Sequence, residues 1–136
     1  MSEKRFEVSV KALIFNRDSF LALSKCTWQD GKFELPGGRS NFGETAEETV
    51  VREVFEETKL TITPLKLVDT WNFVTETRHV AGIIYLCNVE NFENIILSEE
   101  HDKYEWLSTN PKSLDKMAEC FRQPMFKWDW NALKKG

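Results

Sequence analysis

The sequence contains few cysteines, few histidines and no long apolar segment. Its three cysteines, Cys26, Cys87 and Cys120, form no CxxC pair, which argues against a disulfide framework and favours a reducing compartment. The two histidines, His79 and His101, are too far apart in sequence to predict a zinc site, and we expect both at the surface. Because the chain shows neither a signal-peptide pattern nor an apolar stretch of membrane-spanning length, we expect a cytoplasmic protein without a membrane partner.

Length and charge narrow the classes of protein further. A chain of 136 residues favours one domain over 1–136, large enough to bury its own core. With 22 acidic and 18 basic residues the formal charge is −4, which argues against a nucleic-acid polymer as partner. A small phosphorylated ligand remains compatible with that charge, because a bound divalent cation reverses the local sign.

Alternation of apolar residues predicts most of the strands. Residues 6–15 and 20–25 form one predicted hairpin, and residues 65–74 and 79–89 form another. Shorter strands are predicted at residues 31–34 and 104–107, and helices at 45–58, at 111–121 and within 124–134. Strands mixed with few helices favour an α/β sandwich with a mixed sheet.

The helix predicted at residues 45–58 has the densest chemical pattern. Thr45 and Glu48 form a capping box, while Glu53, Glu56 and Glu57 are spaced to share one helical face. Three like charges so close repel each other, but a divalent cation reverses the sign of that energy. Magnesium is commonly held by carboxylates together with substrate phosphates.

This segment resembles the signature of the Nudix hydrolases, G-x5-E-x7-R-E-U-x-E-E-x-G-U, in which U is a bulky aliphatic residue. Lys59 replaces the last glycine of the signature, a position that ends the helix and binds no metal. The lead-in Leu35-Pro36-Gly37 also resembles the family. The positions that match are Gly38, Glu44, Arg52, Glu53, Val54, Glu56, Glu57 and Leu60.

The resemblance implies a Nudix-type α/β/α sandwich that hydrolyses a diphosphate linkage with Mg²⁺, for which Mn²⁺ is an expected substitute. It implies catalytic roles for Glu53, Arg52 and an acid in a late loop, where we choose Glu100 and keep Glu99 as the alternative. It also implies substrate binding at Gly37 and Gly38. The implied metal ligands are Glu53, Glu56, Glu57, the Gly38 carbonyl and Glu100.

Several assignments stay open at the level of sequence. The favoured substrate is a nucleoside triphosphate; the alternatives are nucleotide sugars or ADP-ribose, or a non-catalytic nucleotide sensor. Glu44 either binds a further metal or stabilises the helix N-terminus. The aromatic tail at Phe126, Trp128 and Trp130 covers a sheet face, closes a pocket or forms a homodimer contact. Aromatic residues that could stack a base, although each is more typical of core packing, are Trp28, Phe33, Trp71, Phe73 and Tyr85.

Overall fold

The fold is built on one mixed sheet in a computed structural model that describes residues 3–25, 27, 30–92 and 94–136. Within these residues, strands run in the order β4-β5-β1-β2-β6, and β3 pairs with β1. The β1–β5 pair is parallel, whereas the other pairs are antiparallel. The strands are β1 (Arg5–Asn16), β2 (Ser19–Lys25), β3 (Gly37–Arg39), β4 (Ile62–Val74), β5 (Arg78–Val89) and β6 (His101–Leu107).

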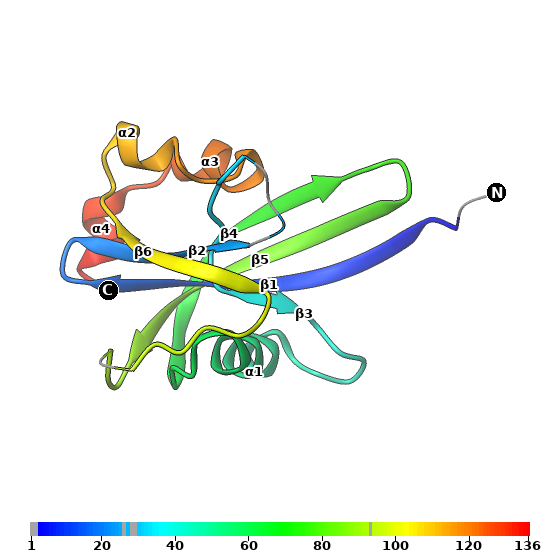
Figure 1. Ribbon diagram of the computed structural model, residues 1–136, viewed down its shortest axis with the longest axis horizontal. Coiled ribbons are helices and arrows are strands. Elements are labelled where there is room, and N and C mark those ends of the chain that lie inside the picture. The colour runs from blue at the N-terminus through cyan, green and yellow to red at the C-terminus, as the bar shows by residue number, and fades with distance from the viewer. Residues whose placement is uncertain (1–2, 26, 28–29, 93) are drawn as a thin grey trace.

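Helices cover both faces of this sheet (Figure 1). Helix α1 (Ala46–Thr58) lies on one face, and α2 (Pro111–Leu114), α3 (Glu119–Met125) and α4 (Trp130–Lys134) lie on the other. Each side has its own apolar cluster, one around Val50 and Val54 of α1 and the other around Phe121 and Met125 of α3. The structure therefore confirms the predicted α/β/α sandwich with a mixed sheet.

Both predicted hairpins are present, with longer strands than predicted. Phe15 pairs with Phe20 across the first turn, and β4 pairs with β5 over almost its whole length. Strand β6 begins at His101, inside the segment that we predicted as a loop, because residues 101–107 pair with β2.

The single helix predicted at residues 111–121 is wrong. The Phe33 backbone N–H donates to the Lys116 carbonyl, and the Ala118 N–H donates to the Phe33 carbonyl. This parallel bridge between Phe33 and the buried Met117 interrupts the helix and leaves α2 and α3 as separate elements. The predicted strand at residues 31–34 is likewise reduced to isolated bridges, one at Phe33 and one between Glu34 and Leu23.

The aromatic tail covers a face of the sheet. Trp130 stacks on Phe20 with ring centroids 5.6 Å apart, and the Trp128 indole N–H donates to Asp69 Oδ2 at 2.7 Å. Both tryptophans pack against the cluster around α3. The homodimer stays a prediction.

The ends of α1 are built as its sequence indicates. The Thr45 side chain accepts from the Glu48 N–H, and the Glu48 carboxylate accepts from the Thr45 N–H, which confirms the capping box. At the other end Lys59 adopts a left-handed conformation with φ of 65°, and its N–H donates to the Phe55 carbonyl. A lysine therefore occupies a backbone conformation that glycine usually takes.

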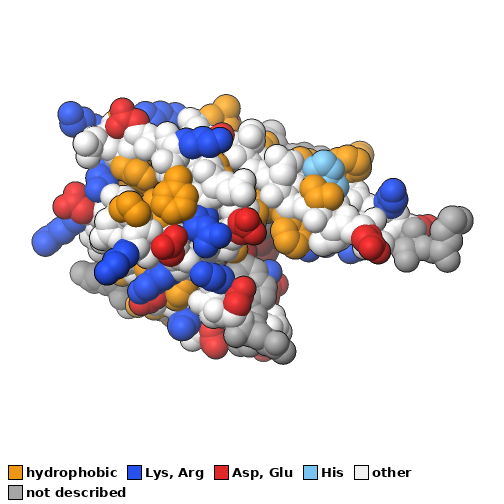
Figure 2. Space-filling view, turned by 90° about the horizontal axis from the view of Figure 1, so that it is seen from above, with side chains coloured by type: hydrophobic (Ala, Val, Ile, Leu, Met, Phe, Trp, Pro, Cys, Tyr) orange, Lys and Arg blue, Asp and Glu red, His pale blue; other side chains and the backbone are white. Residues whose placement is uncertain are grey.

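An arm formed by the start of β1 and the β4–β5 turn projects beyond the helices (Figure 1). Viewed from the side of α2–α4, it carries exposed hydrophobic side chains (Figure 2). The exposed large hydrophobic residues of its strands include Phe6, Phe73 and Val74. No helix among the described residues is both long and apolar enough to cross a membrane.

Candidate active site

A cavity of about 440 Å³ opens beside the C-terminal half of α1. One wall is acidic and the other is largely apolar. The acidic side comprises Glu53 and Glu57 of α1 and Glu100 before β6, next to Gly37 and Gly38 of β3. The apolar side comprises Trp71, Phe73, Val80, Ala118, Cys120 and Phe121. Four of the predicted site residues are thus brought to one wall together with Glu100, which lies more than 40 residues away in the sequence.

Glu57 is the most buried carboxylate of α1. Its Oε1 accepts from the Gly37 N–H at 2.7 Å. Burial raises the pKa of Glu57 to about 7, even though Lys11 and the Gly37 N–H favour the charged form. A cation bound beside such a buried carboxylate strongly stabilises its charged form.

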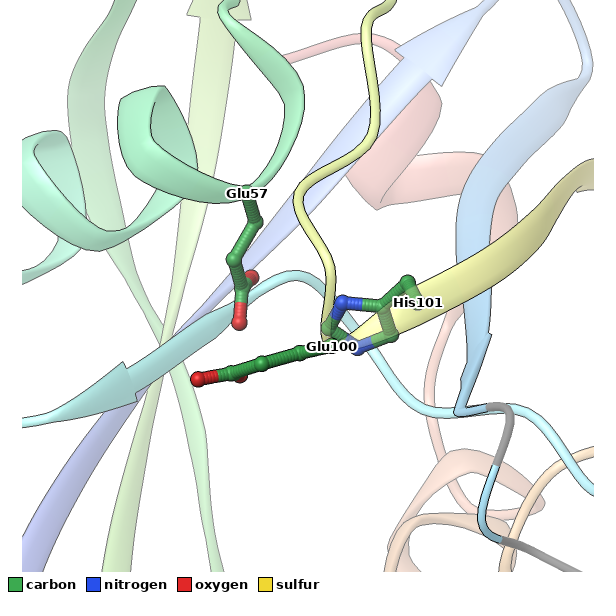
Figure 3. A group of neighbouring side chains, drawn as sticks. All are labelled: Glu57, Glu100 and His101. Carbon is green, nitrogen blue, oxygen red and sulfur yellow. The ribbon is translucent and has the colours of Figure 1, made fainter.

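Glu53 lies against the backbone of β3. A Cβ on Gly38 would come within 2.6 Å of Glu53 Oε2, so the carboxylate fits there only because residue 38 is glycine. Burial raises the pKa of Glu53, and the Arg52 guanidinium works in the opposite direction. Glu100 approaches the same region from the other side, where its carboxylate lies near Glu57 (Figure 3).

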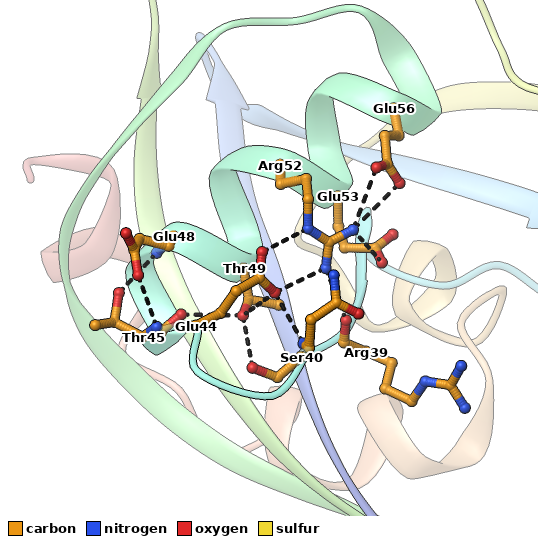
Figure 4. A network of polar contacts seen from close by, with 10 residues as sticks. Arg39, Ser40, Glu44, Thr45, Glu48, Thr49, Arg52, Glu53 and Glu56 are labelled. Atoms are coloured by element: carbon orange, nitrogen blue, oxygen red, sulfur yellow. Dashed lines mark hydrogen bonds and ion pairs between the residues drawn. The ribbon is translucent and has the colours of Figure 1, made fainter.

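Arg52 contacts three carboxylates at once (Figure 4). Its Nε and Nη2 donate to the two oxygens of Glu44 at 2.6 and 2.9 Å, and its Nη1 donates to Glu53 at 3.0 Å and to Glu56 at 3.2 Å. The forked bond to Glu44 fixes the plane of the guanidinium. Arg52 therefore links the carboxylates of Glu44, Glu53 and Glu56.

Glu44, for which metal binding and stabilisation of the helix N-terminus were both considered from sequence, forms an ion pair with Arg52, and those two roles stay predictions. Hydrogen bonding to Arg52, aided by the Asn41 N–H, lowers the pKa of Glu44 to about 2. Both oxygens of Glu44 accept hydrogen bonds from Arg52, so Glu44 holds the arginine in place.

Glu56 differs from Glu53 and Glu57, because its side chain is 55% exposed and does not line the cavity. Its role as a metal ligand stays a prediction.

A buried polar network beneath the acidic wall was missed from sequence. Lys11 Nζ donates to Glu34 Oε1 at 3.0 Å and to the Gly37 carbonyl at 2.9 Å, while His101 Nε2 lies 2.7 Å from Glu34 Oε2. Burial opposes ionisation of Glu34, but Lys11 and His101 outweigh it and lower its pKa to about 2. The prediction that His101 lies at the surface is wrong, because β6 starts at this residue and turns its ring inward. The one signal in the sequence was Lys11, a charge inside an apolar alternation.

The apolar wall is shaped by one cross-strand pair. Trp71 of β4 pairs with Gly82 of β5, and a Cβ on Gly82 would come within 2.1 Å of the indole. Of the residues predicted to stack a base, Trp71 and Phe73 line the cavity. Phe33 and Tyr85 do not line it, and Trp28 lies outside the described residues.

Basic side chains line the outer part of the cavity. Arg39 and Arg78 both lie there, and both approach the carboxylate of Glu7. The hydrogen bond from Arg78 is the largest influence on Glu7, whose pKa is lowered. One carboxylate facing two guanidinium groups leaves positive charge for an anionic ligand.

Neither of the two described cysteines is suited to act as a nucleophile in this chemistry. Cys87 is buried, and burial raises the pKa of its thiol to about 12. Cys120 lines the apolar wall, where burial also raises its pKa. Neither thiol is activated as a nucleophile. Cys26 lies outside the described residues.

The acidic wall fits a hard divalent cation. Its donors are carboxylate oxygens from two elements, which is the chemistry that Mg²⁺ prefers. The missing side chain at Gly38 leaves room for Glu53 among them. The residues of this wall that would hold the cation are Glu53, Glu57 and Glu100; ligation by Glu56 and by the Gly38 carbonyl stays a prediction.

Comparison with known proteins agrees with this arrangement. The NUDIX domain family matches residues 5–128. An 8-oxo-dGTP diphosphatase of Escherichia coli K12 is 35% identical over 77 residues, and the aligned segment covers 57% of this chain and 58% of that protein. A MutT-like protein of Streptomyces ambofaciens is 30% identical over 115 residues, covering 84% of this chain and 71% of that protein.

A similar structure spans the whole chain. The crystal structure of a MutT protein from Methanosarcina mazei Go1 matches with a TM-score of 0.81 at 29% identity, and all of both chains is covered. The family match covers β1, the signature helix α1 and the strands around the cavity. The chain therefore belongs to the Nudix hydrolase family.

Proposed function

We propose that this protein is a magnesium-dependent pyrophosphohydrolase that cleaves a diphosphate linkage in a nucleoside triphosphate or a related nucleoside diphosphate derivative. The observation that carries the proposal is the meeting of Glu53, Glu57 and Glu100 at one wall of a cavity whose other wall is aromatic. Phosphates carried by a cation fit the first wall, and a planar base fits the second. The volume of about 440 Å³ suits a ligand of nucleotide size.

Each carboxylate has its own task in this proposal. Glu57 is fixed by the Gly37 N–H and is the most buried carboxylate of α1, so it serves as a ligand. Glu53 and Glu100 face the open cavity, where either can accept a proton. Arg52, locked by Glu44, keeps Glu53 in position and is a positioning residue.

The reaction balances without any further reagent. A water oxygen bonds to phosphorus, the anhydride P–O bond breaks, and the water proton passes to Glu53 or Glu100. A divalent cation supplies charge neutralisation for the phosphoryl oxygens and activation of the water. Arg39 and Arg78 contribute positive charge for the outer phosphates.

The relatives support the substrate class that we propose. The Escherichia coli relative is an 8-oxo-dGTP diphosphatase, which makes oxidised and ordinary deoxynucleoside triphosphates the first substrates to test. The screen should also contain ADP-ribose, a nucleotide sugar and a dinucleoside tetraphosphate. Products should be identified by chromatography, with Mg²⁺, with Mn²⁺ and with chelator alone.

We expect a nucleoside monophosphate and pyrophosphate from at least one triphosphate, with Mg²⁺ required. Glu57→Gln should abolish the turnover, whereas Glu47→Gln should retain it, since Glu47 is an exposed residue of the same helix. Preference for ADP-ribose or a nucleotide sugar would correct the substrate class. Binding of nucleotides without turnover under any metal would refute the enzyme and favour the sensor.

A further inference from the structure

The feature that leads further is the orientation of His101. Its side chain has no exposed surface, and its Nε2 lies 2.7 Å from Glu34 Oε2. Glu34 is buried as well, and its other oxygen accepts from Lys11. A carboxylate held by a lysine in this way is an acceptor, so the imidazole Nε2 carries the proton in that contact.

The other ring nitrogen is then defined by elimination. In the neutral ring with Nε2 protonated, Nδ1 presents a lone pair. Nδ1 is fully buried and has no hydrogen-bond partner among the described residues. Buried polar atoms without a partner are rare, and each calls for a group that would satisfy it.

The imidazole ring lies next to two carboxylates. Glu57, Glu100 and His101 offer one ligand atom each, and these atoms lie within 4.8 Å of one another. Figure 3 shows the ring beside both glutamates, with Glu57 coming from α1 and Glu100 preceding His101 in the chain.

We propose that His101 Nδ1 is a nitrogen ligand of a divalent cation that His101 shares with Glu57 and Glu100, with Glu34 as the residue that orients the ring. This inference rests on the proposed function, since it concerns the metal of the same cavity. A histidine bound to a metal through one nitrogen commonly donates its other N–H to a carboxylate, and Glu34 is in that position.

The proposal changes the expected metal preference. The sequence suggested ligands that are all oxygen, a set that suits Mg²⁺. One imidazole among the carboxylates favours Mn²⁺ and other transition ions over Mg²⁺. The competing explanation is that His101 only anchors Glu34 and that a buried water satisfies Nδ1.

A spectroscopic measurement on the full chain separates these explanations. Mn²⁺ is added to tag-free protein without nucleotide, and pulsed electron paramagnetic resonance records nuclear couplings to the ion. We expect a directly bonded ¹⁴N coupling, replaced by a ¹⁵N coupling when only the histidines are labelled with ¹⁵N. This test needs no substitution, so it does not depend on the folding of a variant.

Two variants show which histidine gives the nitrogen coupling. His101→Gln should remove the nitrogen coupling and weaken Mn²⁺ binding by about 10- to 100-fold, with a smaller loss for Mg²⁺. His79→Gln is the matched control, since His79 lies on β5 against Phe6 and Asn72, and it should keep both the coupling and the affinity.

The outcomes distinguish the two proposals. Mn²⁺ that binds with no nitrogen coupling in the wild-type protein would overturn the role of His101 and leave the proposed hydrolase intact. Absence of Mn²⁺ binding would overturn the role of His101 and also remove the metal site of the proposed function. Nitrogen coupling without hydrolysis of any nucleotide would support the ligand while the proposed function fails.

Discussion

Replacing Glu57 with glutamine should stabilise the protein while it inactivates the enzyme. The pKa of Glu57 is raised from 4.5 to about 7, chiefly by burial. The folded protein therefore holds this proton more tightly than the unfolded chain does. The contribution of Glu57 to the free energy of unfolding has its full value below pH 4.5. It declines as pH rises and is lost above about pH 7.

The size of the effect follows from the same shift. The interval between 4.5 and about 7 corresponds to roughly 3 kcal/mol at most. Glutamine imitates the protonated side chain and keeps an oxygen for the Gly37 N–H. Above pH 7.5 and without metal, Glu57→Gln should raise the free energy of unfolding by about 1–3 kcal/mol.

Urea unfolding followed by tryptophan fluorescence, in chelator and between pH 5 and pH 8.5, measures this change. The wild-type protein should lose stability across the window and the variant should lose less. Added Mg²⁺ should stabilise the wild-type protein more than the variant, because only the former keeps the ligand charge. Glu56→Gln is the control, since its side chain is 55% exposed and should change stability little. A variant no more stable than wild type at pH 8 would refute the reasoning.

Three other predictions concern activity and the helix end. Glu57→Gln and Glu56→Gln should each lower kcat by at least about 100-fold at saturating Mg²⁺, because each removes a predicted ligand charge; a change below about threefold in both would remove the metal helix from the mechanism. Glu100→Gln should lower kcat more than it raises KM, and Glu99→Gln should be mild; the opposite order would transfer the role to Glu99. Lys59→Gly should be neutral or stabilising by up to about 1 kcal/mol in urea unfolding, since glycine fits the left-handed backbone; a clear loss would show that the lysine contributes more than its strain costs.

The sequence predicted what depends on local spacing. The capping box and the carboxylates of α1 follow from helical periodicity, and the two hairpins follow from alternating apolar residues. The residues of the family signature are contiguous, so the resemblance could be recognised from the sequence. That resemblance predicted the fold of the whole chain. The left-handed conformation of Lys59 was also foreseeable from its position after the helix.

What the sequence did not show depends on residues that meet only in the folded chain. Lys11, Glu34 and His101 come from three separate segments. Lys11 interrupts an apolar alternation, but nothing local to Glu34 or His101 indicates a buried network. The break between α2 and α3 has the same origin, since it is imposed by the pairing of Phe33 with Met117. Tertiary contacts decided these cases against local pattern.

The contact between Trp71 and Gly82 lies on β4 and β5, whereas the carboxylates of the acidic wall come from α1 and from the segment before β6. The indole can lie against β5 only because its cross-strand neighbour has no side chain, and the same indole lines the cavity. Any larger residue at position 82 pushes the ring away from β5 while leaving α1 untouched. Under the proposed function, a substitution at position 82 would therefore change which bases fit the cavity, and selectivity would be tuned from the β4–β5 hairpin without disturbing the carboxylates of α1.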